Sequence, residues 1–110
     1  MIRVRMDFLE YAMEMKGHAN APREGELDLV CCAASTLGQL LLYSLEEYKA
    51  QHGGITRIDE TAEPGHLKVK VRCREWARVA VKTRMDMIRE GMEMLQERYP
   101  EYIMIEEEME

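Results

Sequence analysis

Residues 28–54, DLVCCAASTLGQLLLYSLEEYKAQHGG, decide the fold because they predict one long amphipathic helix between two pairs of strands. Apolar side chains recur there at intervals of three and four residues from Ala34 to Tyr48, which places them on one helix face. Asp28 is a suitable N-cap, and Gly53 with the glycine that follows is a suitable C-terminal stop. The sequence thus predicts a helix that begins after Asp28 and ends before Gly53.

The segments on both sides of this helix alternate between apolar and polar residues. Such a period of two predicts half-buried strands, and they cover residues 2–8, 11–16, 55–60 and 67–73. The first two strands are joined by a turn near Leu9 and Glu10. The second two are joined at Pro64 and Gly65, which suit the central positions of a type II turn. Each pair is therefore expected to form an antiparallel hairpin.

A second amphipathic helix is predicted over residues 75–99, where Pro100 ends it. Residues 102–105 are long enough for a short last strand, and residues 106–110 are expected to be a frayed acidic tail. The order of elements predicts an α+β fold, a two-layer sandwich in which two long helices cover an antiparallel sheet. At 110 residues, we expect a single domain over residues 1–110.

The net charge of −6 argues against a direct nucleic-acid partner, since that affinity depends on clustered Lys and Arg, and it suits a basic protein or peptide substrate. No apolar run is expected to span a membrane, and the first residues do not resemble a secretory signal. The protein is therefore expected to be cytoplasmic. Its three cysteines are an odd number with two adjacent, which suits neither a disulfide framework nor a metal motif.

Cys31 falls in the first turn of the long helix, where unpaired backbone N–H groups and the positive end of the helix dipole stabilise a thiolate. It lies on the flank of the core-facing stripe and is a candidate nucleophile, and the same N–H groups would hold an oxyanion. A free cysteine is more often a small buried hydrophobe, and its position alone does not decide between the two. Cys32 points away from the core, and Cys73 continues the apolar face of its strand.

His18 is the candidate base, because it lies where the second strand ends and the loop toward the helix begins. A solvated loop histidine is the alternative interpretation. His52 belongs to a helix C-terminus and His66 to a turn, so their claims are weaker. Neither a C-x-x-C nor an H-x-x-x-H spacing is present, and we expect no metal and no cofactor.

Two motifs in the chain resemble the ribosomal-processing cysteine protease (Prp) family. Gly17-His18-Ala19 corresponds to the family's G-H-A, and Asp28-Leu29-Val30-Cys31, followed by Ala33 and Ser35, corresponds to its D-[IL]-V-C-x-A-x-S at the start of a long helix. The second helix also closes with the family's Tyr-Pro-x-Tyr pattern, here at Tyr99-Pro100-Glu101-Tyr102. The resemblance therefore extends over most of the chain.

The resemblance implies peptide hydrolysis by a dyad of Cys31 and His18, with Asp28 and Ser35 as supporting groups. It implies as substrate the N-terminal extension of a large-subunit ribosomal protein, and as assembly a homodimer. It also implies a loop between the two dyad residues that gates access to the site. Gating residues would be Gly17, Ala19 and Gly25.

Two departures from the family pattern leave alternatives open. Residues 25–28 hold one residue more than the family's usual G-x-D, and Cys32 replaces a usual Ala. The alternatives are a divergent protease that acts on a phage structural protein and a catalytically idle, ribosome- or assembly-associated binding module. A redox pair of Cys31 and Cys32 is disfavoured, because adjacent cysteines form a strained ring.

Overall fold

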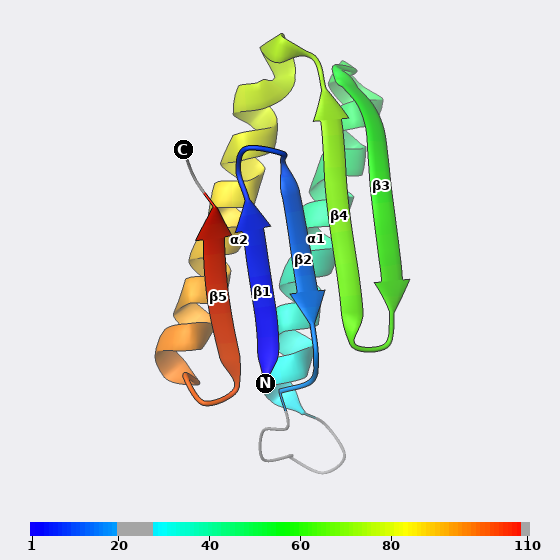
Figure 1. Ribbon diagram of the computed structural model, residues 1–110. Coiled ribbons are helices and arrows are strands. Elements are labelled where there is room, and N and C mark those ends of the chain that lie inside the picture. The colour runs from blue at the N-terminus through cyan, green and yellow to red at the C-terminus, as the bar shows by residue number, and fades with distance from the viewer. Residues whose placement is uncertain (20–27, 109–110) are drawn as a thin grey trace.

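The computed structural model describes residues 1–19 and 28–108. In chain order the elements are β1 (Ile2–Asp7), β2 (Ala12–Lys16), α1 (Leu29–His52), β3 (Ile55–Glu63), β4 (His66–Cys73), a short 3-10 helix η1 (Glu75–Ala77), α2 (Arg78–Arg98) and β5 (Ile103–Glu108). In the described part of the chain, the strands form one five-stranded sheet and both long helices pack on the same face of it (Figure 1). The predicted two-layer α+β fold is confirmed.

The sheet is mixed, which corrects the prediction of a wholly antiparallel one. Its strand order is β3-β4-β2-β1-β5. The two hairpins and the β2–β4 pair are antiparallel, but β5 pairs with β1 in parallel. The physical reason is the connection: α2 carries the chain back along the length of the sheet, so β5 starts at the same end as β1 (Figure 1).

Local sequence signals account for the first hairpin. Alternate residues of β1 are buried, as the period of two predicts, and the turn after β1 lies where expected. The Asp7 carboxylate accepts hydrogen bonds from the backbone N–H groups of Leu9 and Glu10, both at 3.0 Å. Tyr11 adopts a positive φ of 54° at the end of this turn. An aspartate that hydrogen-bonds the backbone two and three residues onward is a common way to nucleate a turn.

The helix α1 begins and ends at the predicted signals. Asp28 is its N-cap, and Gly53 is its C-cap with a φ of 69°. By length and composition alone α1 is apolar enough to cross a membrane, contrary to our expectation from the sequence. Its buried residues nevertheless face the core, as those of a central helix in a folded domain do. These residues are Val30, Ala34, Gly38, Leu41, Leu42 and Leu45.

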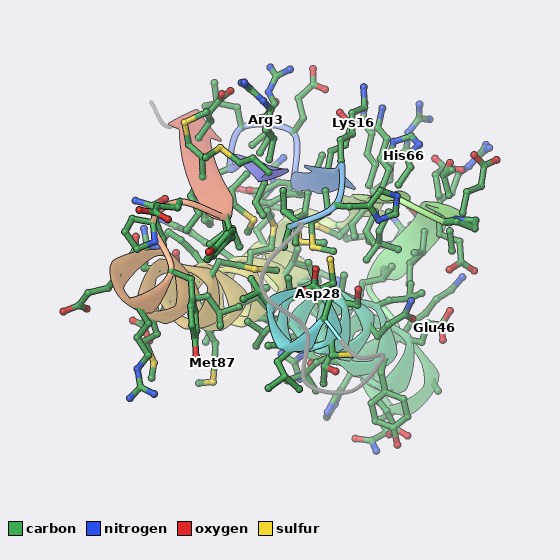
Figure 2. All side chains as sticks on the ribbon, turned by 90° about the horizontal axis from the view of Figure 1, so that it is seen from below. Arg3, Lys16, Asp28, Glu46, His66 and Met87 are labelled. Atoms are coloured by element: carbon green, nitrogen blue, oxygen red, sulfur yellow. The ribbon has the colours of Figure 1, made fainter. Side chains whose placement is uncertain are left out.

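The core lies between the sheet and the two helices. β1 contributes Val4 and Met6, and α2 contributes Met85 and Met92, all almost inaccessible to solvent. The open face of the sheet carries charged side chains such as Arg3 and Lys16, while Met87 projects from the outer side of the helix layer (Figure 2).

The last strand extends into the C-terminal acidic segment. The sequence predicts a frayed tail over residues 106–110, and β5 extends through Glu108 beside β1. Arg3 and Glu106 approach each other to 3.9 Å on the open face of the sheet. The two last residues of the chain lie outside the described residues.

Candidate functional site

A pocket of about 400 Å³ lies at one end of the sheet. It is lined mainly by the end of β2, the start of α1 and the turn between β3 and β4. One wall is a single face of α1, formed by Cys31, Ser35 and Gln39. Another part of the lining is the turn between β3 and β4. Apolar side chains of the sheet complete the lining, and they are Ile2, Met15 and Leu67.

Cys31 occupies the first turn of α1, at the edge of this pocket. It is partly buried, which confirms its predicted place on the flank of the helix. Its backbone N–H donates a hydrogen bond to the Asp28 carboxylate at 3.0 Å. Its Sγ accepts a hydrogen bond from the backbone N–H of Ala19 at 3.1 Å. A hydrogen bond donated to sulfur favours the thiolate over the thiol.

His18 lines the same pocket from the other side of the gap between β2 and α1. The chain leaves β2 through Gly17, which has a φ of 94° and donates its N–H to the carbonyl oxygen of Gly65 at 2.9 Å. The imidazole of His18 is exposed and lies against Gly65 in the β3–β4 turn. The structure therefore brings both predicted dyad residues to one cavity.

The two predicted supporting residues have different environments. Asp28 is only 6% exposed and caps α1, and Figure 2 shows it on the side of the helix layer that faces the sheet. Ser35 lies one helical turn after Cys31 and lines the pocket with an exposed side chain. Ala19 is buried, and its N–H is the donor to the cysteine sulfur. Gly25, predicted for the gating loop, lies outside the described residues.

Sequence reasoning missed Gln39 as a pocket residue, and it predicted the turn at Pro64 and Gly65 without placing that turn at the pocket. Gln39 follows Cys31 by eight residues, so the helical period alone would have placed both on one face. No comparable signal placed this turn beside the pocket, because its position in space depends on the pairing of β2 with β4. That pairing joins residues far apart in the sequence, and strand alternation does not reveal partners.

Of the other two histidines, His66 also lines the pocket and His52 does not, and each has a partner of its own. His66 Nε2 lies 2.8 Å from a carboxylate oxygen of Glu14, and this hydrogen bond holds the pKa of Glu14 below its usual value, against the opposing effect of its burial. His52 packs against Tyr48 with ring centroids 4.8 Å apart. Over residues 1–19 and 28–108, no three His, Cys, Asp or Glu side chains gather into a group that would hold a metal ion.

The remaining cysteines differ from Cys31 in their surroundings. Cys32 is exposed and lies beside an apolar groove between α1 and α2, away from the Cys31 pocket. Cys73 packs against the core as predicted, and its burial raises the pKa of its thiol, although Arg78 acts in the opposite direction. Only Cys31, among the three, lies in the pocket with a histidine.

Comparisons with known proteins agree with this architecture. Residues 1–104 match the sequence profile of the family described as Cysteine protease Prp. No curated protein sequence matches the chain. Among solved structures, the chain is similar to an essential ribosomal processing protease Prp from S. aureus in complex with a covalently linked product peptide. The TM-score is 0.74 and the identity 20%, over 98% of this chain and 100% of that one.

A second structure of the S. aureus protease, in complex with a substrate peptide, gives a TM-score of 0.68 at 20% identity over the same shares of the two chains. Likeness at this identity shows a shared fold. The family profile covers nearly the whole chain and includes the pocket with its cysteine and histidine. This chain belongs to the cysteine protease Prp family.

Proposed function

We propose that this protein is a cysteine endopeptidase in which Cys31 and His18 form the catalytic dyad. The observation that carries the proposal is that both side chains line one pocket at the N-terminus of α1, where the Cys31 sulfur accepts the Ala19 N–H. A nucleophile, a base within the same cavity and donors for an oxyanion are the parts that acyl transfer requires.

In the proposed reaction, His18 takes the proton of the Cys31 thiol and the sulfur attacks the carbonyl carbon of the scissile peptide bond. The oxyanion that forms is held by backbone N–H groups of the first helical turn other than that of Cys31, which donates to Asp28. The C–N bond then breaks, and His18 returns its proton to the leaving amine, so that an acyl thioester remains on Cys31. Water, deprotonated by His18, hydrolyses the thioester and restores the free enzyme.

The supporting residues act on the position of the nucleophile. Asp28 caps α1 and accepts the N–H of Cys31, so it fixes the turn from which the sulfur projects. Ser35 presents a hydroxyl one turn farther along the same face, where it would meet a bound peptide. Gly17, Ala19 and Gly25 belong to the loop that we propose to gate the pocket.

The substrate that we propose is the N-terminal extension of a large-subunit ribosomal protein. The solved structures of the S. aureus ribosomal processing protease contain a substrate peptide and a covalently linked product peptide. This supports the proposal of a peptide substrate for the present chain. The net charge of −6 favours a basic polypeptide. We further propose a cytoplasmic homodimer, for which the exposed Met87 and Met94 of the outer helix face would provide apolar contact area.

The test is incubation of the protein with the precursor of such a ribosomal protein, followed by intact-mass analysis. We expect loss of the extension, and a reduction of at least about 10³-fold in rate for Cys31→Ala and for His18→Ala. Cys32→Ala is the matched control, because it removes the adjacent thiol outside the pocket, and it should keep the wild-type rate. Cleavage by Cys31→Ala at the wild-type rate would refute the proposed dyad.

Two further outcomes separate the alternatives. The same incubation with a phage structural protein in place of the ribosomal precursor tests the alternative of a divergent protease. The pH dependence of Cys31 alkylation tests the binding module, because an idle module should show an ordinary thiol that titrates near ~8.5. A peptidase should instead react with iodoacetamide at clearly lower pH.

A further inference from the structure

Gly65, in the turn between β3 and β4, lies directly against the imidazole of His18. A Cβ added to Gly65 would lie 2.8 Å from His18 Nε2 and 3.2 Å from Cε1. Real Cβ atoms essentially never approach other heavy atoms to less than 3.0 Å. The ring therefore occupies space that exists only because residue 65 has no side chain.

The same glycine also holds the backbone next to His18. Its carbonyl oxygen accepts the N–H of Gly17 at 2.9 Å, and the adjacent pair of the β2–β4 ladder is Lys16 with His66. Gly65 thus holds the backbone of Gly17, the residue before His18, and also lies against the His18 ring. The turn that supplies these contacts has a φ of 74° at Gly65, so its shape is set by a conformation that favours glycine.

Contact with a fixed surface matters because the His18 side chain is exposed. An exposed side chain otherwise exchanges rotamers rapidly, whereas a catalytic base must be held within hydrogen-bonding reach of the proton that it takes. A backbone surface restricts the imidazole without adding a group that competes for its nitrogen atoms. The same turn consequently lines the pocket and restricts the orientation of the His18 imidazole.

We propose that Gly65 is a positioning residue for His18, and that the β3–β4 turn holds the imidazole in the orientation required to deprotonate Cys31. This inference rests on the proposed dyad. The turn would act on the proton transfer only indirectly, by positioning the imidazole, and none of its atoms would react.

The test is a pair of substitutions, Gly65→Asn and Gly65→Ala, measured by steady-state peptide cleavage. Both add a Cβ that collides with the imidazole, but Asn tolerates a positive φ better, so it keeps the turn where Ala is strained. We expect kcat to fall about 10- to 100-fold in both, because displacement of a reacting group by about 1 Å costs rate on this scale. KM should change less than about threefold.

Gly53→Ala is the matched control. Gly53 has a φ of 69°, close to that of Gly65, and a Cβ added there would meet nothing within 4 Å among the described residues. It caps α1 at the end away from the pocket. Gly53 also has a ψ of −154°, a conformation almost restricted to glycine, so Gly53→Ala should lower Tm by at least about 4 °C through backbone strain and should keep the wild-type kcat.

A pH profile separates positioning of the base from a general loss of structure. In the Gly65 variants, the limb of the kcat/KM profile that depends on His18 should shift, whereas in Gly53→Ala the profile should keep its shape. In a His18→Ala background, Gly65→Asn should cause no further loss, because the group on which it acts is absent.

The outcomes distinguish this inference from the dyad on which it rests. Wild-type activity of His18→Ala would overturn the dyad. The positioning role alone would be overturned if His18→Ala is inactive and Gly65→Asn is nevertheless as active as Gly53→Ala. An additional loss on adding Gly65→Asn to His18→Ala would likewise overturn it, because the turn would then act through something other than the imidazole.

Discussion

The N-cap of α1 provides a prediction that can be worked through quantitatively. The Asp28 carboxylate accepts the backbone N–H of Cys31 at 3.0 Å, and the side chain is only 6% exposed. Replacing an N-cap by Ala costs about 0.5–2 kcal/mol, and a buried carboxylate belongs at the upper end of that range. We therefore expect Asp28→Ala to lower the free energy of unfolding by about 2 kcal/mol.

A domain of 110 residues has an unfolding entropy of about 0.23 kcal/mol/K near its melting temperature. A loss of about 2 kcal/mol therefore corresponds to a decrease in Tm of about 9 °C, which thermal unfolding followed by circular dichroism detects easily. Asp28→Asn is the matched control, because it keeps an oxygen acceptor and removes only the charge. We expect it to recover at least half of the lost Tm.

Two results would refute this reasoning. If Asp28→Ala melts within about 2 °C of the wild type, the cap makes no appreciable contribution to stability. If Asp28→Asn melts together with Asp28→Ala, the charge and not the hydrogen-bond acceptor provides the stabilisation. Urea unfolding at neutral pH checks that the change in Tm reflects free energy and not a changed entropy.

Two further predictions concern the sheet. Gly17→Ala should cost at least about 2 kcal/mol in urea unfolding, because its Cβ would lie 2.5 Å from the Met1 carbonyl oxygen at a φ of 94°; unchanged stability would contradict this contact. His66 holds the pKa of Glu14 below the usual 4.5, so the carboxylate stabilises the fold above that value, and its contribution disappears as pH falls through the lowered pKa. Glu14→Gln should therefore cost about 0.5 kcal/mol at neutral pH and almost nothing well below the lowered pKa, whereas an equal loss at both would refute the linkage.

Much of the local structure could be predicted from the sequence because its causes are local. The alternation in β1, the Asp28 cap and the stop at Gly53 each depend on residues within a few positions of one another. The placement of Cys31 on the flank of α1 follows from the helical period in the same way. His18 could be proposed because it precedes that helix by one loop.

The order of the strands could not be predicted, because it depends on pairing between distant segments. Alternation shows which side chains of a strand face the core, but it is the same for every possible neighbour. The parallel pairing of β5 with β1 therefore had no signal in the sequence. The extent of β5 through Glu108 had no signal for the same reason, because acidic residues in isolation indicate a solvated terminus and the pairing with β1 cannot be read from them.

The contact between Gly65 and His18 has a consequence for when the site forms during synthesis. Both proposed dyad residues lie in the first third of the chain, yet the surface that the imidazole contacts belongs to the second hairpin. A nascent chain that has emerged only through α1 carries the cysteine and the histidine without that surface. If Gly65 positions His18 as proposed, proteolytic competence would require docking of β4 on β2, and a partly synthesised chain would lack the geometry to cleave its neighbours.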